Sequence, residues 1–260
     1  MDAKRMAARA SGENGTPLVA SFIIDAMTEN KTTTPHFHGE SATANQNEHH
    51  FAARVFGVEV ICGANLVDGY FIYTTDHFMD KGSNLMVEIQ RQALADLEDL
   101  LRLSGRSLRG GIVHLHFDNS TENKNKTMFF YLSMLVELEH FSQITVNFLM
   151  VGHTHSSIDQ FFSQLSGVIK DAPFLATDLA IRQLLSSHLL SRPPIICRPV
   201  NVYYDCVTAW KDEHYKYVHY NGPHVYRIVK RGAKACMEYM LYTSDKKWLP
   251  SAPRSKEIEK

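Results

Sequence analysis

Three aspartates, Asp25, Asp118 and Asp159, have the positions best suited to chemistry in this chain. Asp25 and Asp118 end apolar, β-branched runs, and Asp159 stands at the start of an amphipathic stretch. Three carboxylates that converge in one place repel one another unless a cation is bound. Because Mg²⁺ takes oxygen ligands, often one or two carboxylates with waters and phosphate oxygens, the acids predict a Mg²⁺ or Mn²⁺ site.

The predicted chemistry of such a site is phosphodiester cleavage or strand transfer. Two ions about 4 Å apart can activate a water or a 3′-hydroxyl and stabilise the leaving oxygen. Each acid taken alone has a structural alternative as a turn former or helix cap, and Asp159 could simply favour the positive end of its helix. The joint placement of the three favours a shared catalytic site.

Histidines stand close to two of these acids. His114, His116 and Asp118 alternate along one predicted strand, so their side chains point to the same face. We interpret His114 as a hydrogen-bonded core residue and His116 as a residue able to orient the site. His153 and His155, in GHTHSSID, are candidate further metal ligands or proton shuttles. A zinc-dependent hydrolase stays open as an alternative, although the H-E-x-x-H spacing of zincins is absent.

The loop after Asp118, NSTENKNK, is the candidate substrate-binding segment. In open α/β sheets, ligands bind at the carboxyl ends of the strands, where this loop is expected. Its predicted substrate-binding residues are Asn119, Asn123, Lys124, Asn125 and Lys126. The lysines would meet phosphates. A solvated loop with a helix cap is the equally open alternative.

Hydrophobic periodicity predicts the elements that position these residues. Strands are expected at residues 18–25, 52–66, 70–75, 112–118 and 144–151, and helices at 83–103, 128–141 and 158–169. A polar loop is expected at 28–50 and a further helical stretch at 179–190. The order β-β-β-α-β-α-β-α, with an antiparallel hairpin followed by crossovers, predicts an α/β protein with a ribonuclease-H-like mixed five-stranded sheet.

The chain divides into an extension at residues 1–17, this domain at 18–192 and a small β-rich appendage at 193–260. Residues 201–260 carry 11 Lys or Arg against 7 Asp or Glu, although the whole chain has a net charge of −1. Cations are interleaved there with Tyr203, Tyr204, Tyr215, Tyr217, Tyr220 and Tyr226. The pattern predicts an appendage that contacts nucleic acid near the acids; a well-packed half-buried sheet is the alternative.

Composition excludes several other classes of protein. The chain is 44% hydrophobic and 21% charged, as in ordinary globular proteins. Its four cysteines form no C-x-x-C pair, which argues against a zinc knuckle. The first residues contain no apolar signal region, and no apolar run approaches the roughly 20 residues of a membrane helix. We therefore expect an intracellular protein with no membrane partner.

Two motifs resemble the signatures of an uncharacterised eukaryotic domain family found in transposon-derived proteins. HFDNSTENKNK is similar to D-N-x-x-x-[EDQ]-N-K-N, and GHTHSSIDQFF is similar to G-H-T-H-x-x-I-D-x-x-F. The resemblance covers about residues 18–170, including the strand that ends in Asp25 and the Thr-rich loop before Pro35. That family is regarded as transposase-like with a ribonuclease H fold, so the resemblance implies this fold and an acidic site.

The resemblance implies a nuclear, transposase-like nuclease that acts on DNA rather than RNA, with a homo-oligomer left open. Two departures favour a different function. The first motif is one residue shorter here, and Ser156 and Ser157 stand where relatives often carry an acidic pair. The alternative is a catalytically inactive, transposase-derived module that binds nucleic acid or protein.

Overall fold

The computed structural model describes residues 7–8, 17–38, 51–63, 66–149, 157–189, 195–212 and 222–250. Its longer strands are β1 (Val19–Ala26), β5 (Arg54–Cys62), β6 (Val67–Thr75), β7 (Gly111–Phe117), β8 (Phe141–Phe148), β10 (Ile195–Pro199), β11 (Val225–Arg231) and β12 (Lys234–Met240). The short strands are β2 (Thr33–Thr34), β3 (His36–Phe37), β4 (Phe51–Ala52), β9 (Phe174–Leu175) and β13 (Leu249–Pro250). The helices are η1 (Glu29–Lys31), α2 (Ser83–Leu103), α3 (Lys126–Glu137), α4 (Ser157–Asp171), α5 (Asp178–Leu189) and α6 (Cys206–Ala209).

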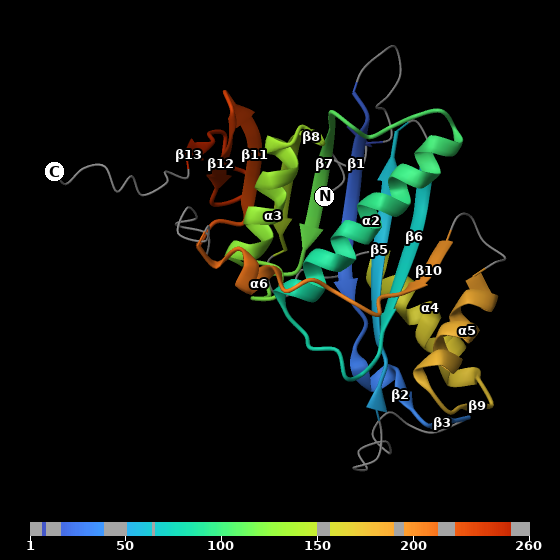
Figure 1. Cartoon of the computed structure of the whole chain (residues 1–260). Helices are drawn as coiled ribbons and strands as arrows, with labels where there is room; N and C mark the ends of the chain where they lie inside the picture. Colours follow the sequence, from blue (N-terminus) through green and yellow to red (C-terminus); the bar gives the residue numbers. More distant parts are fainter. Residues whose placement is uncertain are drawn as a thin grey trace.

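One nine-stranded mixed sheet, in the order β10-β6-β5-β1-β7-β8-β11-β12-β13, forms the centre of the molecule (Figure 1). Strand β5 is antiparallel to both of its neighbours, β1 and β6. Strands β1, β7 and β8 are mutually parallel, and β11 runs antiparallel to β8. The carboxyl ends of β1, β6, β7 and β8 therefore lie at the same end of the sheet.

Helices cover both faces of the sheet: α2 and α3 lie across one face, and α4 and α5 lie on the other (Figure 1). Strand β1 contributes to both cores because successive side chains point to opposite faces. Phe22 and Ile24 pack in the core beneath α2 and α3, whereas Ile23 packs with α4 and α5. This two-sided burial explains why the first strand is continuously apolar in sequence.

The predicted strands and helices are present in the predicted order. Helix α2 spans the predicted residues 83–103, and its chain turns away at Gly105, whose φ is 67°. Helix α3 begins two residues earlier than predicted because Asn125 caps it, its side chain accepting a hydrogen bond from the Met128 N–H. Part of the loop expected at residues 28–50 is regular, forming η1, β2 and β3, and residues 39–50 lie outside the described part.

The prediction of a five-stranded sheet was wrong, because strands from the C-terminal segment extend it at both edges. Strand β10 pairs with β6, and β11 pairs with β8. The β-rich segment after residue 193 therefore continues the main sheet and is not a module beside it. The physical reason is that β6 and β8 would otherwise present rows of unpaired backbone N–H and C=O groups. Among the described helices, none combines the length and apolar character needed for a bilayer crossing.

Candidate functional site

The fold places the three predicted acids at one end of the sheet. Asp25 is the second-last residue of β1, and Asp118 directly follows β7. These strands are parallel neighbours, with Ile23 opposite His116, so both aspartates lie at carboxyl ends. Asp159 lies in the first turn of α4, a helix that packs against β1 and β5.

Burial and neighbouring negative charge both act on the Asp25 carboxyl group. Burial raises the pKa of Asp25 from its ordinary value of 3.8 to about 6, and the Ala26 N–H, which donates to Oδ1 at 2.8 Å, partly opposes the rise. The negative charges of Asp118 and Asp159 raise it further. All three carboxyl groups therefore act on one neighbourhood, where a bound cation would relieve their repulsion.

The donor set fits a hard cation that retains several waters. Within the described ranges, no three His, Cys, Asp or Glu side chains lie close enough to hold a metal ion by themselves. His153 and His155, the further predicted ligands, lie outside the described residues. Mg²⁺ is commonly held by one or two carboxylates with waters and substrate phosphates, whereas a structural zinc site needs four protein ligands. The oxygen-rich set around Asp25 matches the first pattern.

We expect Asp25→Asn to increase stability at pH 7–8 by about 1–2 kcal/mol when no divalent ion is present. The folded-state pKa lies above the unfolded value, so the folded state binds more protons between pH 3.8 and about 6. Stability from this group is therefore present below pH 4 and is lost as pH rises through 6. Urea unfolding of the wild type and Asp25→Asn at pH 4 and pH 7.5 measures the difference in their stability. An equal difference at both pH values would contradict the burial of the Asp25 charge.

The loop after β7 is built around Asp118. Oδ1 of Asp118 accepts hydrogen bonds from the Ser120 N–H, at 3.3 Å, and from the Asn123 side-chain amide. Asn123 is only 6% exposed, and its Oδ1 has no hydrogen-bond partner among the residues that the structure describes. Both of these hydrogen bonds use the same carboxylate oxygen of Asp118, so the carboxylate is oriented by its own loop.

Other residues predicted to bind substrate hold the loop together. Lys124 is buried, donates to Asn119 Oδ1 at 3.1 Å, and lies 5.1 Å from the centre of the Phe148 ring. Burial lowers the pKa of Lys124. Asn125 caps α3, and Lys126 is the first residue of that helix. Asn119 is exposed and Lys126 half-buried. Contact of these side chains with a phosphate stays a prediction.

We expect Asn125→Ala to lower the free energy of unfolding by about 1 kcal/mol, since it removes a side-chain cap. The Asn125 amide also donates to the carbonyl oxygens of Thr121, at 3.1 Å, and Glu122, at 2.6 Å, so the loop itself would loosen. Thermal unfolding of Asn125→Ala and Asn125→Ser measures the effect. Because Ser is an equally good cap and both variants lack the amide donor, a loss of equal size in both would contradict the capping role.

The position of Asp159 depends on close packing of α4 against β5. A Cβ atom at Gly57 would lie 2.7 Å from Phe162 Cε1 and 3.0 Å from Ile158 Cδ1, so this strand position requires glycine. At the start of α4, the Ser157 hydroxyl donates to Oε2 of the buried Glu59. The helix end that carries Asp159 is therefore tied to β5 by both packing and a polar contact.

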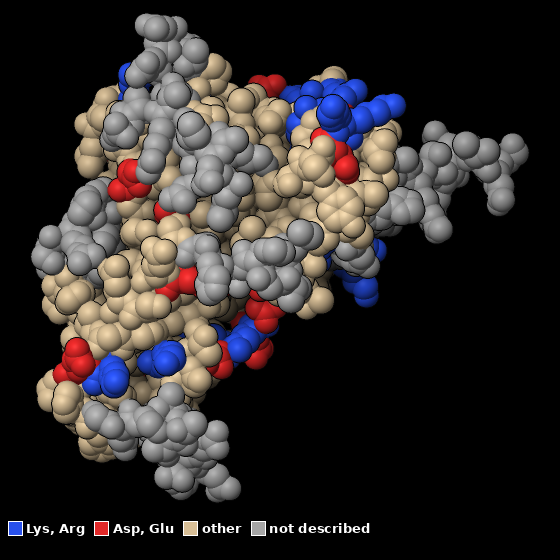
Figure 2. All heavy atoms as spheres, turned by 180° about the vertical axis from the view of Figure 1, so that it is seen from behind, with Lys and Arg blue, Asp and Glu red and all other residues tan. Residues whose placement is uncertain are grey.

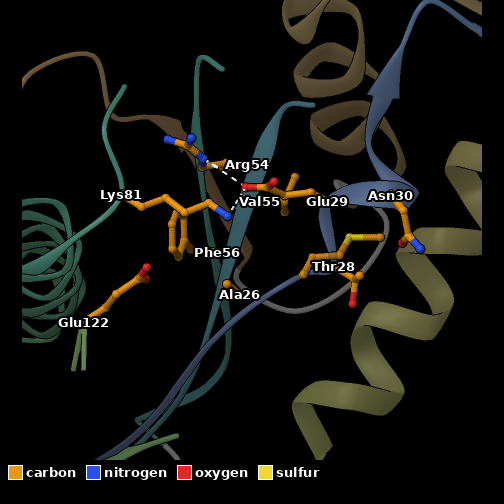
Figure 3. A pocket seen from close by; sticks show the side chains of 10 residues that line it. Ala26, Thr28, Glu29, Asn30, Arg54, Val55, Phe56, Lys81 and Glu122 are labelled. Atoms are coloured by element: carbon orange, nitrogen blue, oxygen red, sulfur yellow. Dashed lines mark hydrogen bonds and ion pairs between the residues drawn. The ribbon is translucent and has the colours of Figure 1, made fainter. Parts of the chain in front are cut away.

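A pocket of about 390 Å³ lies beside the acids and was not predicted (Figure 3). Its lining comes from the end of β1 and the loop that follows, from the start of β5, from Lys81 and from Glu122. At its rim, Glu29 Oε1 pairs with Lys81 at 2.6 Å and with Arg54 at 3.1 Å. These three residues are distant in sequence and belong to no motif, so periodicity and spacing carried no signal for them.

The C-terminal aromatic and basic residues are placed differently from the prediction. Tyr226 is fully buried and packs on Phe129 and Phe148, so it cannot stack on a base. Of the predicted set, Tyr215, Lys216, Tyr217 and Tyr220 lie outside the described residues. Among the described ones, Tyr204 is 73% exposed.

The cations of β11 and of its turn into β12 lie away from the acids. Arg227 and Arg231 pair with Glu238, and Lys230 pairs with Glu139. Because β11 runs antiparallel to β8, its turn into β12 lies at the opposite end of the sheet from Asp118. Lys and Arg gather at that corner, at the upper right of Figure 2. For the cations of β11 and its turn, the prediction of a place near the acids was therefore wrong, because strand pairing carries them to the far end.

A family model described as "Domain of unknown function (DUF7869)" matches residues 44–245, most of the chain. The chain belongs to this family. Membership agrees with the resemblance to an uncharacterised family, and the family's description states no activity. The matched range holds Asp118, Asp159 and the Asp118 loop, whereas Asp25 precedes it. The chain matches no curated protein and no solved structure.

Proposed function

We propose that this member of the DUF7869 family is a ribonuclease-H-like domain that cleaves or joins phosphodiesters of DNA with Mg²⁺ or Mn²⁺. The order β6-β5-β1-β7-β8, with only β5 antiparallel, supports the proposed fold. The transposase-like motifs around Asp118 and Asp159 support the reaction class. The observation that carries the proposal is the position of Asp25 and Asp118 at the carboxyl ends of the parallel neighbours β1 and β7, with Asp159 in the first turn of α4.

The protein's own groups have distinct roles in this proposal. Asp25 and Asp118 hold the cation, and Asp159 completes the acidic set together with His153 or His155. When bound, the divalent ion supplies activation of a water or 3′-hydroxyl and stabilisation of the leaving oxygen. The Ala26 N–H and the Asn123 amide orient Asp25 and Asp118 through the bonds that their carboxylates accept.

Nicking of supercoiled plasmid DNA tests the proposal. We expect relaxation with Mg²⁺ or Mn²⁺, none with EDTA, and loss of activity in Asp159→Asn. Asp99→Asn is the matched control, because Asp99 is an exposed residue of α2 whose ion pair in the described part of the chain is with Arg102 on the same helix. Nicking that persists in EDTA, or that is equal in Asp159→Asn and the wild type, would refute the metal-dependent reaction.

A catalytically silent binding module is the second candidate. It is favoured by the lack of a ready three-ligand group in the described part of the chain and by Ser157, whose hydroxyl bonds to Glu59 where relatives often carry acids. Isothermal titration with Mn²⁺ separates the two candidates. Binding heat that disappears in Asp118→Asn supports the enzyme, and no heat in the wild type supports the silent module.

A further inference from the structure

The pocket beside β1 has balanced charge at its rim. Arg54 and Lys81 contribute two positive charges, and Glu29 and Glu122 contribute two negative ones. Both cations already pair with Glu29. Burial alone would raise the pKa of Glu29, but the hydrogen bonds from Lys81 and Arg54 outweigh it and hold that pKa below its ordinary value. A phosphate would therefore find no unpaired cation among these lining residues, whereas a neutral group would meet no net charge.

Apolar side chains form the inner part of the pocket. Met27, Val55 and Phe56 line it and are almost completely buried, with exposures of 5%, 1% and 4%. A volume of about 390 Å³ falls within the range of sites for small organic ligands, which combine apolar walls with a few fixed polar groups. The fixed carboxylate of Glu29 accepts the hydrogen bonds from Arg54 and Lys81 through Oε1, and its Oε2 is a second acceptor on the same group. A flat, neutral ring with N–H donors at its edge suits these walls.

The position of the pocket connects it to the acidic site. Ala26 and Met27, which follow Asp25 directly, both line the pocket. Glu122 of the Asp118 loop lies across from Ala26 (Figure 3). None of the three acids lines it. A nucleotide next to a phosphodiester held at the acids would therefore have this pocket within its immediate surroundings.

We propose that the pocket receives an unpaired nucleobase of the nucleic acid whose phosphodiester is held at Asp25 and Asp118. This inference rests on the proposed function and names the form of its substrate: a single strand, or a duplex with an extruded base. A base inside a duplex has its edge paired and its faces stacked, and it must leave the stack to enter such a pocket. Burial of the released base against Met27, Val55 and Phe56 offsets part of that cost.

Binding of two single-stranded DNA oligomers of equal length, one bearing bases and one wholly abasic, tests the inference. Fluorescence anisotropy with Ca²⁺ in place of Mg²⁺ keeps a divalent cation with the same oxygen preference at the acids and slows turnover. Both oligomers carry the same phosphate charge. We expect the abasic oligomer to bind about 10-fold more weakly, as stacking contributes about 1–3 kcal/mol per base. Equal affinities, or no binding of either oligomer, would overturn the proposal.

Variants that fill the pocket test whether the difference in affinity between the two oligomers arises there. Thr28→Met and Asn30→Met place an unbranched side chain, without ring or charge, at exposed lining positions, and Thr28 makes no side-chain cap bond. We expect either variant to weaken binding of the base-bearing oligomer at least threefold and to leave abasic binding unchanged. Thr243→Met, at an exposed position outside the pocket, is the matched control. An unchanged ratio in both pocket variants, with wild-type thermal unfolding, would overturn the assignment.

The outcomes separate this inference from the proposed function. If the protein nicks plasmid DNA but shows no preference for base-bearing DNA, the pocket assignment is wrong and the proposed reaction stands. If the preference for base-bearing DNA depends on Thr28 and Asn30 but the protein never nicks DNA with Mg²⁺ or Mn²⁺, the pocket assignment stands and the proposed reaction is wrong.

Discussion

Asp118→Asn is expected to lower metal-dependent nicking of DNA by about 10³-fold or more. Metal-ion stabilisation of transition-state charge amounts to several kcal/mol, and each 1.36 kcal/mol corresponds to a factor of ten in rate. The substitution retains the shape of the side chain and removes its charge. Oδ1 of Asp118 already accepts bonds from the Ser120 N–H and the Asn123 amide, so the loop keeps acceptable partners if the new amide oxygen occupies that position.

The measurement is the initial rate of plasmid nicking across a range of Mn²⁺ concentrations. A weakened metal site shifts the Mn²⁺ dependence and lowers the rate, whereas a loosened loop lowers thermal stability. Asn123→Ala is the informative companion, because it removes a bond to the carboxylate without removing its charge. We expect Asn123→Ala to retain more activity than Asp118→Asn. Wild-type rates in Asp118→Asn would exclude this residue from the reaction.

Gly57→Ala is expected to destabilise the fold by about 1–3 kcal/mol, the typical cost of overpacking a core. Its Cβ would lie 2.7 and 2.9 Å from two ring atoms of Phe162 and 3.0 Å from Ile158, so α4 would have to move away from β5. Asp159 directly follows Ile158 in the same helix. We therefore expect nicking to fall together with stability, measured by urea unfolding and plasmid nicking on the same preparation.

Two variants make the Gly57 result interpretable. Gly167→Ala, inside α4, meets no atom within 4 Å and should stabilise the helix by up to about 1 kcal/mol. Phe162→Leu removes the ring that the new Cβ would strike, so its combination with Gly57→Ala should be less destabilising than the sum of the two changes. Strict additivity, or a Gly57→Ala protein as stable as the wild type, would contradict the close approach of α4.

Local sequence patterns were sufficient to predict the central elements. The apolar run at residues 18–25 is a strand buried on both faces, and the helical period at residues 83–103 is α2. The positions of Asp25 and Asp118 at carboxyl ends followed from those strands, because side-chain period and strand direction are set over a few residues.

Pairing between distant segments could be decided only by the tertiary structure. The edges of a sheet can accept any strand of suitable length, so nothing local indicated that β10 would join β6 or that β11 would join β8. The same pairing buries Tyr226 and carries the basic turn of β11 and β12 away from the acids. The sequence pattern around a tyrosine in an alternating strand is the same whether its ring faces a core or a ligand, so the pattern could not distinguish the two.

The pocket depended on tertiary structure in the same way. Glu29, Arg54 and Lys81 have no common period or motif, and they meet only because β1 and β5 are antiparallel neighbours and the loop before α2 crosses their end. Lys124 looked like a solvated loop cation in sequence, yet it is buried against Phe148. By itself, the sequence determined which strands and helices form and which ends carry the acids. Edge pairing, burial and long-range ion pairs were decided by the folded chain, because these interactions join residues whose separation in sequence carries no pattern.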